Sequence, residues 1–161
     1  VDQAIDWIRR HTTTKVEFHI LSSGQKSLPL TGCTDGEPEL IYYDPMDRDR
    51  VQDVLSRMNF GLVSLHPSLD QPGYPSKVFD YIASNVPVLY FGRPLPSFTG
   101  DLERAGVGKV LSDTELDLTS LYNEMMTGWV GKRDAFWRQT SLSPEKLQRA
   151  FDSAIPVPTE S

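Results

Sequence analysis

The chain has 161 residues, a formal net charge of −6 and a hydrophobic content of 39%, which is enough for one domain with a buried core. The acidic balance argues against nucleic-acid binding, because neutralising phosphates requires clustered Lys and Arg side chains. The single cysteine, Cys33, excludes an intrachain disulfide and a cysteine-based zinc site, and favours a reducing, cytoplasmic location. No apolar run approaches the roughly 20 residues of a membrane-spanning helix.

Helical and strand-like patterns alternate along the first part of the chain. Residues 1–11 predict an amphipathic helix and residues 16–21 a strand. After a connection rich in Gly, Pro, Ser and Thr, the pattern predicts a strand at 40–43, a helix at 48–58 and a buried strand at 60–65.

The alternation continues to the C-terminal part. A helix and strand are expected within residues 75–92, a short helix at 102–105 and a strand at 110–111, with further helices beyond Asp117. Strands separated by helices imply parallel pairing through right-handed crossovers. We therefore predict an α/β fold with a doubly wound, Rossmann-like parallel sheet, as one domain over residues 1–155 with a flexible tail at 156–161.

The most informative segment is PSKVFDYIASNVPVLYFG, which runs from Pro75 to Gly92. Ser76 is the predicted N-cap of a helix, and Lys77 and Asp80 project away from its apolar face. That face consists of Val78, Phe79, Ile82 and Ala83. A helix start with a hydroxyl, a cation and free backbone N–H groups suits an anionic ligand.

Ligands of open α/β sheets bind beyond the carboxyl ends of the strands. Two loops qualify here, namely residues 22–24 and the longer loop at 66–76. Neither contains a G-x-G-x-x-G fingerprint or a P-loop, so the sequence supports neither an NAD enzyme nor a P-loop ATPase.

The segment LVSLHPSLDQPGYPSKVFDYIASNVPVLYFG resembles the donor-site region of retaining glycosyltransferases of family 4, which have the two-domain GT-B fold. The shared pattern is a Pro-Ser pair after a strand, a loop with glycine, a helix that carries an acid, a small residue and a Pro-Val strand. Here these are Pro67-Ser68, Gly73, Asp80, Ala83 and Pro87-Val88. A weaker match includes Gly24, Gly106, Gly108 and the final helices, so the resemblance spans most of the chain. It implies the C-terminal, nucleotide-sugar-binding half of a GT-B enzyme.

The resemblance also implies roles for individual residues. Asp80 takes the position of the acid that holds the ribose hydroxyls. Ser76 and Lys77 would contact the diphosphate, and Lys77 is the one residue to which we assign a catalytic role. Gly24 would lie near the base, and the backbone of Gly73 near the sugar. Tyr74 would either pack over the ligand or hold the loop in place.

One departure from the family concerns the acid that contacts the transferred sugar. Its position aligns with Gln71 or Pro72, and Asp70 stands beside it as a substitute. The acceptor-binding half is also absent, so we expect the isolated chain to be inactive.

The predicted activity is transfer of a sugar from a nucleotide-diphosphate sugar to a glycan or lipid-linked acceptor, with retention, in polysaccharide biosynthesis. The resemblance implies neither a metal nor a cofactor. The expected partners are the donor and a missing N-terminal acceptor domain of the same protein. Peripheral association of the parent enzyme with a membrane is compatible with this.

Two alternatives remain open at this stage. The first is a non-catalytic, doubly wound binding or regulatory module of the receiver or flavodoxin type, in which Asp44 would be the one strand-end acid; the proline after it makes Asp44 a poor phosphorylation site. The second is a degenerate glycosyltransferase half that acts as a scaffold. Without the resemblance, Lys77 and Asp80 would be interpreted as ordinary solvated helix residues. His19 is interpreted as a structural histidine in either case.

Overall fold

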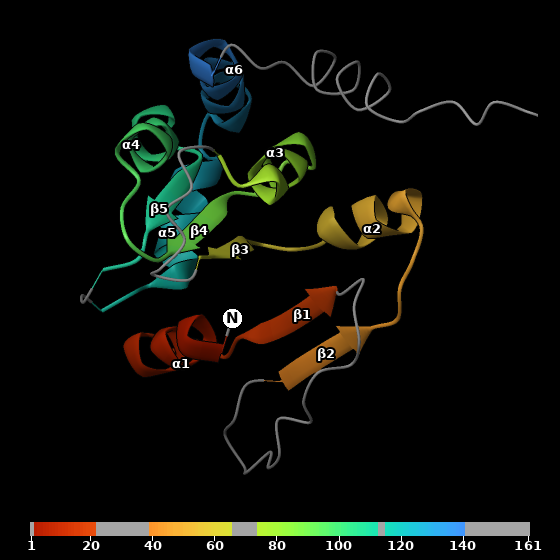
Figure 1. Ribbon diagram of the computed structural model, residues 1–161. Coiled ribbons are helices and arrows are strands. Elements are labelled where there is room, and N and C mark those ends of the chain that lie inside the picture. Colours follow the sequence, from red (N-terminus) through yellow and green to blue (C-terminus); the bar gives the residue numbers. More distant parts are fainter. Residues whose placement is uncertain (1, 22–38, 66–73, 113–114, 141–161) are drawn as a thin grey trace, which may run out of the picture.

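The computed structural model describes residues 2–21, 39–65, 74–112 and 115–140 of the chain. Helices and strands alternate from the start, as predicted (Figure 1). The first four elements are α1 (Asp2–His11), β1 (Glu17–Leu21), β2 (Glu39–Tyr43) and α2 (Arg48–Leu55).

The C-terminal part follows with β3 (Gly61–Ser64), α3 (Ser76–Ala83), β4 (Val88–Phe91), α4 (Pro96–Ala105), β5 (Gly108–Val110), α5 (Leu118–Met126) and α6 (Trp129–Thr140). α4 begins six residues earlier than the helix predicted at 102–105. Its first residue is Pro96, whose fixed backbone angle suits the first position of a helix. The predicted C-terminal helices beyond residue 140 and the tail at 156–161 lie outside the described residues.

All strand pairs are parallel, which confirms the predicted type of pairing. β1 pairs with β2, and β3, β4 and β5 form a second sheet in chain order. The predicted α/β class is thus confirmed, but the described strands form two small parallel sheets rather than the single doubly wound sheet that was predicted. Figure 1 shows the β1–β2 pair set apart from the other three strands.

Helices cover both faces of the three-stranded sheet. Successive residues of a strand point to opposite faces, and β4 follows this rule with all four side chains at least partly buried. On one face the buried residues are Val63, Val88 and Tyr90 from the strands, Val78 and Ile82 from α3, Phe98, Leu102 and Ala105 from α4, and Trp129, Phe136 and Trp137 from α6. On the other face, Leu89 packs with Trp7 and Ile8 of α1 and with Leu111 and Leu118. This is the three-layer packing of an α/β domain.

A tight turn centred on Asn85 follows α3. Asn85 adopts a left-handed backbone conformation with φ of 60°, which Asn tolerates better than most residues. Its side-chain oxygen accepts hydrogen bonds from Trp129 Nε1 at 3.1 Å and Arg133 Nη1 at 2.8 Å. The turn between α3 and β4 is thereby tied to α6.

Candidate functional site

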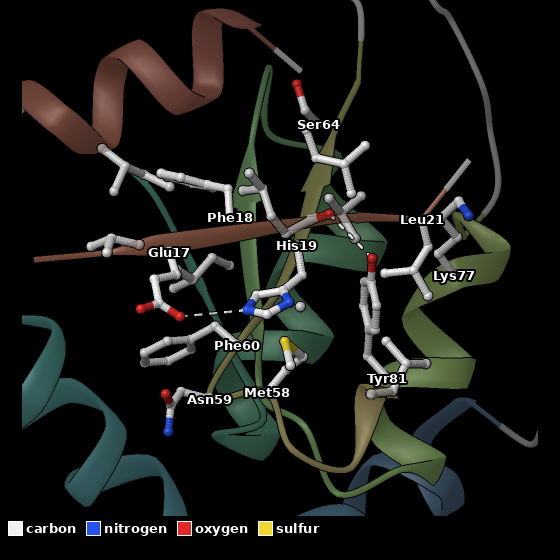
Figure 2. A pocket seen from close by; sticks show the side chains of 18 of the residues that line it. Glu17, Phe18, His19, Leu21, Met58, Asn59, Phe60, Ser64, Lys77 and Tyr81 are labelled. Carbon is white, nitrogen blue, oxygen red and sulfur yellow. Dashed lines mark hydrogen bonds and ion pairs between the residues drawn. The ribbon is translucent and has the colours of Figure 1, made fainter. Parts of the chain in front are cut away.

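A cavity of about 930 Å³ lies between β1 and β3, which belong to different sheets. Most of its wall is apolar and comes from these two strands together with Ile5 and Ile8 of α1. Figure 2 shows this wall and the polar residues that interrupt it. Four polar residues belong to the end of β3 and the first turns of α3, and we call them the polar rim: Ser64, Ser76, Lys77 and Asp80.

The start of α3 differs from the prediction in one respect. Pro75, with an extended backbone, occupies the N-cap position, and no side chain caps the helix. Ser76 is the first helical residue, so the expectation that it is the N-cap is wrong. Proline is favoured at helix starts because its missing N–H costs nothing there. The Ser76 hydroxyl, which is exposed, therefore has no capping role.

Lys77 lies in the first turn of α3 with an exposed side chain. In Figure 2 it stands next to Leu21, the last residue of β1. No carboxylate of the described residues forms an ion pair with it. Its ammonium group is therefore available to an anion at the carboxyl end of β1.

Asp80 follows Lys77 by one helical turn and lines the same cavity. Its side chain reaches solvent, yet the surrounding protein removes part of its water. This desolvation raises the pKa of Asp80 above its usual value, while the nearby cations Arg48 and Lys77 act in the opposite direction. The exposed carboxylate is an acceptor-only group and can accept hydrogen bonds from a ligand.

His19 was not assigned a ligand role from the sequence, yet its ring projects into the cavity (Figure 2). Its Nδ1 lies 2.9 Å from the hydroxyl of Tyr43 on β2, and its Nε2 lies 3.8 Å from a carboxylate oxygen of Glu17. The parallel register places His19 opposite Ile41, two residues before Tyr43. Glu17 and His19 lie two residues apart on one face of β1, whereas Tyr43 reaches them only through the pairing of β1 with β2, which no local sequence pattern indicates.

Tyr74 is turned away from the cavity and into the aromatic core. Its ring lies within 6.4 Å of Phe79, Phe98 and Phe136, measured between ring centroids. Its hydroxyl donates a hydrogen bond to Asp101 on α4. Burial and this carboxylate raise the pKa of Tyr74 to about 12. Of the two roles expected for Tyr74, these contacts correspond to holding its segment in place.

The structure therefore brings together three of the predicted site residues, Ser76, Lys77 and Asp80, and adds Ser64 and His19 to them. The predicted residues Gly24, Asp70, Gln71 and Gly73 lie outside the described residues. Within the described part of the chain, no group of three or more His, Cys, Asp or Glu side chains is arranged to hold a metal ion.

Asp44, the acid considered for a receiver-like module, is exposed directly after β2. It lines a separate, smaller cavity of about 440 Å³ with Arg50, Asp53 and Arg57. Among the helices that the structure describes, none is long and apolar enough to cross a membrane.

Comparison with known proteins yielded no match to a family model, a curated protein or a solved structure. The polar rim and its cavity are therefore the observations from which a function must be argued.

Proposed function

We propose that this chain is the donor-nucleotide-binding domain of a cytoplasmic, retaining glycosyltransferase. In this proposal the domain is one half of a GT-B enzyme, and the missing N-terminal half supplies the acceptor site. The observation that carries the proposal is the placement of Lys77 and Asp80, one helical turn apart, on the wall of one large cavity at the start of α3.

The polar rim matches the chemistry of a nucleoside diphosphate. Lys77 and the first-turn N–H groups of α3 present positive charge to an anion. Asp80 presents a carboxylate on the same cavity wall, which suits the neighbouring hydroxyls of a ribose.

Lys77 and the N–H groups at the start of α3 would also contribute to catalysis by stabilising the leaving group. When the bond between the anomeric carbon and the diphosphate breaks, negative charge develops on the departing phosphate oxygens. A fixed ammonium group and oriented N–H groups stabilise that charge without reorganising. Lys77 is therefore the group to which we assign leaving-group stabilisation.

Titration of the 161-residue chain with UDP, GDP and ADP, followed by thermal unfolding, tests the proposal. A ligand that binds the native state raises the unfolding temperature by mass action. We expect one of the three nucleotides to do so at millimolar concentration. Lys77→Ala should weaken that response about 10- to 100-fold, as the loss of a charge-assisted hydrogen bond of about 1.5–3 kcal/mol implies.

Lys109→Ala is the matched control. Lys109 is an exposed lysine on β5 that lies 3.6 Å from Glu103 and does not line the cavity. Its loss should leave the nucleotide response unchanged. Equal weakening by both substitutions would indicate general charge attraction, and no response to any of the three nucleotides would contradict the proposal.

A further inference from the structure

One edge of β3 has no strand partner among the described residues. On the paired edge, Gly61 N–H donates to Pro87 O at 2.9 Å and Leu65 N–H donates to Phe91 O at 3.2 Å. Backbone groups alternate in direction along a strand, so the N–H groups of Leu62 and Ser64 point to the opposite edge. β3 pairs with β4 alone.

That free edge faces the cavity. All of residues 57–65 line it, and so do all of residues 14–21, which include β1. Beside the edge, the ring of Tyr81 packs so closely on Gly61 that a Cβ there would lie 2.3 Å from it. The Tyr81 hydroxyl reaches the carbonyl oxygen of Leu62 at 3.5 Å, a distance at the limit for a hydrogen bond. This contact engages a carbonyl oxygen only, and no backbone hydrogen bond among the described residues engages the N–H groups of Leu62 and Ser64.

The side chains around this edge are apolar, as they are around a strand in the interior of a sheet. Ile5 and Ile8 of α1 and Phe18 and Ile20 of β1 line the same cavity. Unpaired backbone groups beside apolar side chains are costly, since buried N–H and C=O groups are almost always paired. A β-strand in this position would hydrogen-bond to the alternating N–H and C=O groups of the edge. Its side chains would pack against the apolar residues on either side.

We propose that the inner part of this cavity accepts an apolar β-strand that pairs in parallel with the free edge of β3 and leads directly into α1. In Figure 2 the first turn of α1 lies at the end of the cavity marked by Ser64, where such a strand would finish. α1 then connects to β1, which completes a strand, helix and parallel strand unit of the usual right-handed type.

The added strand would join the two small sheets into one. β1 and β2 make a two-stranded sheet, which is marginal by itself, and the new strand would lie between β1 and β3. The polar rim lies at the carboxyl ends of these strands, so this proposal leaves Lys77 and Asp80 accessible. It does not depend on the identity of the ligand that binds there.

The test compares two versions of the 161-residue chain that carry different extensions joined to Val1. The first extension, Lys-Lys-Val-Ile-Val-Ile-Val-Gly-Ser, supplies a strand and a tight turn into α1. The control, Lys-Lys-Val-Pro-Val-Pro-Val-Gly-Ser, has the same length and charge, but its two prolines lack the N–H groups that pairing in a sheet requires at those positions. Residue-specific amide exchange by NMR and thermal unfolding are measured for both and for the unextended chain.

We expect the strand extension to slow exchange at Leu62 and Ser64 at least tenfold, and to change Gly61 and Val63 less, because these two already face β4. The unfolding temperature should rise by at least about 5 °C. If the unextended chain lacks a cooperative transition, the strand extension should create one. Equal effects of the two extensions, or no change at Leu62 and Ser64, would overturn the proposal. Since no nucleotide is present, this outcome is separate from that of the proposed function.

Discussion

The three-stranded sheet β3–β4–β5 and the two-stranded pair β1–β2 have the same parallel pairing but very different surroundings. Val88, Leu89 and Tyr90 of β4 are each at most 3% exposed, and helices cover both faces of their sheet. No residue of β1 is fully buried, and Tyr42 of β2 is 49% exposed. Parallel sheets normally have both faces covered, so the β1–β2 pair lacks packing that its pairing type requires.

This difference bears on the candidate site. Lys77 and Asp80 sit on α3, which buries Val78 and Ile82 against the well-packed sheet. His19 and Glu17 sit on the weakly packed pair. The rim residues on α3 are therefore held more firmly than the residues on the facing wall, and rigid support favours precise ligand contacts.

The largest expected effect is in the core of the three-stranded sheet. Phe98 is 1% exposed and packs its ring against Tyr74 and Tyr90. Phe98→Ala should lower the free energy of unfolding by about 3–5 kcal/mol, through lost burial and the cavity left behind. Tyr42→Ala, on exposed β2, should change it by at most about 0.5 kcal/mol. Chemical denaturation measures both, and equal losses would contradict the comparison.

Gly61 and Gly131 test how tightly the well-packed side of the comparison, the three-stranded sheet and its helices, is filled. A Cβ on Gly61 would lie 2.3 Å from the ring of Tyr81, whereas a Cβ on Gly131 in α6 would meet no atom within 4 Å. Gly61→Ala should therefore destabilise the protein by about 1–3 kcal/mol through overpacking. Gly131→Ala should stabilise it by about 0.5–1 kcal/mol, because Ala favours a helix. Urea unfolding measures the free energy of unfolding of both variants. An unchanged value for Gly61→Ala would contradict the close packing of Tyr81 on Gly61.

Tyr74→Phe probes the connection between residue 74 and α4. Loss of the hydrogen bond to Asp101 should cost about 1–3 kcal/mol, since a partly buried carboxylate loses its donor. The pKa of Tyr74 is raised from 10.0 to about 12, so the folded state holds this proton more tightly than the unfolded state. Its contribution to stability is fully present below pH 10 and is lost as the pH rises towards 12. A variant whose stability falls over this pH range as steeply as that of the original chain would contradict the assignment.

Asp80→Asn should have a small and opposite effect on stability. Because the folded-state pKa of Asp80 is raised, ionisation opposes folding, and stability falls as the pH rises from the usual value to the raised one. Removing the charge should therefore leave the protein equally stable or up to about 1 kcal/mol more stable at pH 7. Nucleotide binding should nevertheless weaken about 5- to 10-fold, because the amide is a poorer acceptor than a carboxylate. Unfolding and binding assays on one preparation separate the two effects, and a stability loss with unchanged binding would refute this role.

Much of the fold was predictable because its signals are local. The apolar run of β4 predicted a buried strand, and the spacing of Val78 and Ile82 predicted the core face of α3. The division into two sheets was not predictable, because strand neighbours depend on contacts far apart in the sequence.

The candidate site likewise has residues that are close together in the sequence, which could be predicted, and residues that are far apart in the sequence, which could not. The rim residues Ser76, Lys77 and Asp80 come from one helix start, so a short segment of sequence was enough to group them. The approach of His19 to Tyr43, and of Tyr74 to Asp101, spans 24 and 27 residues. Such pairs depend on strand register and helix packing, which no local pattern encodes. The N-cap error at Ser76 arose because proline competes with serine for a helix start.

The most direct test of the central claim is an NMR titration of the 161-residue chain with UDP, GDP and ADP, which reports on each backbone amide. The account predicts that one of these nucleotides shifts the amides of Ser64 and of residues 76–80, and that Lys77→Ala removes these shifts while Lys109→Ala preserves them. Shifts confined to β5 and α6, or no shift with any of the three nucleotides, would contradict it.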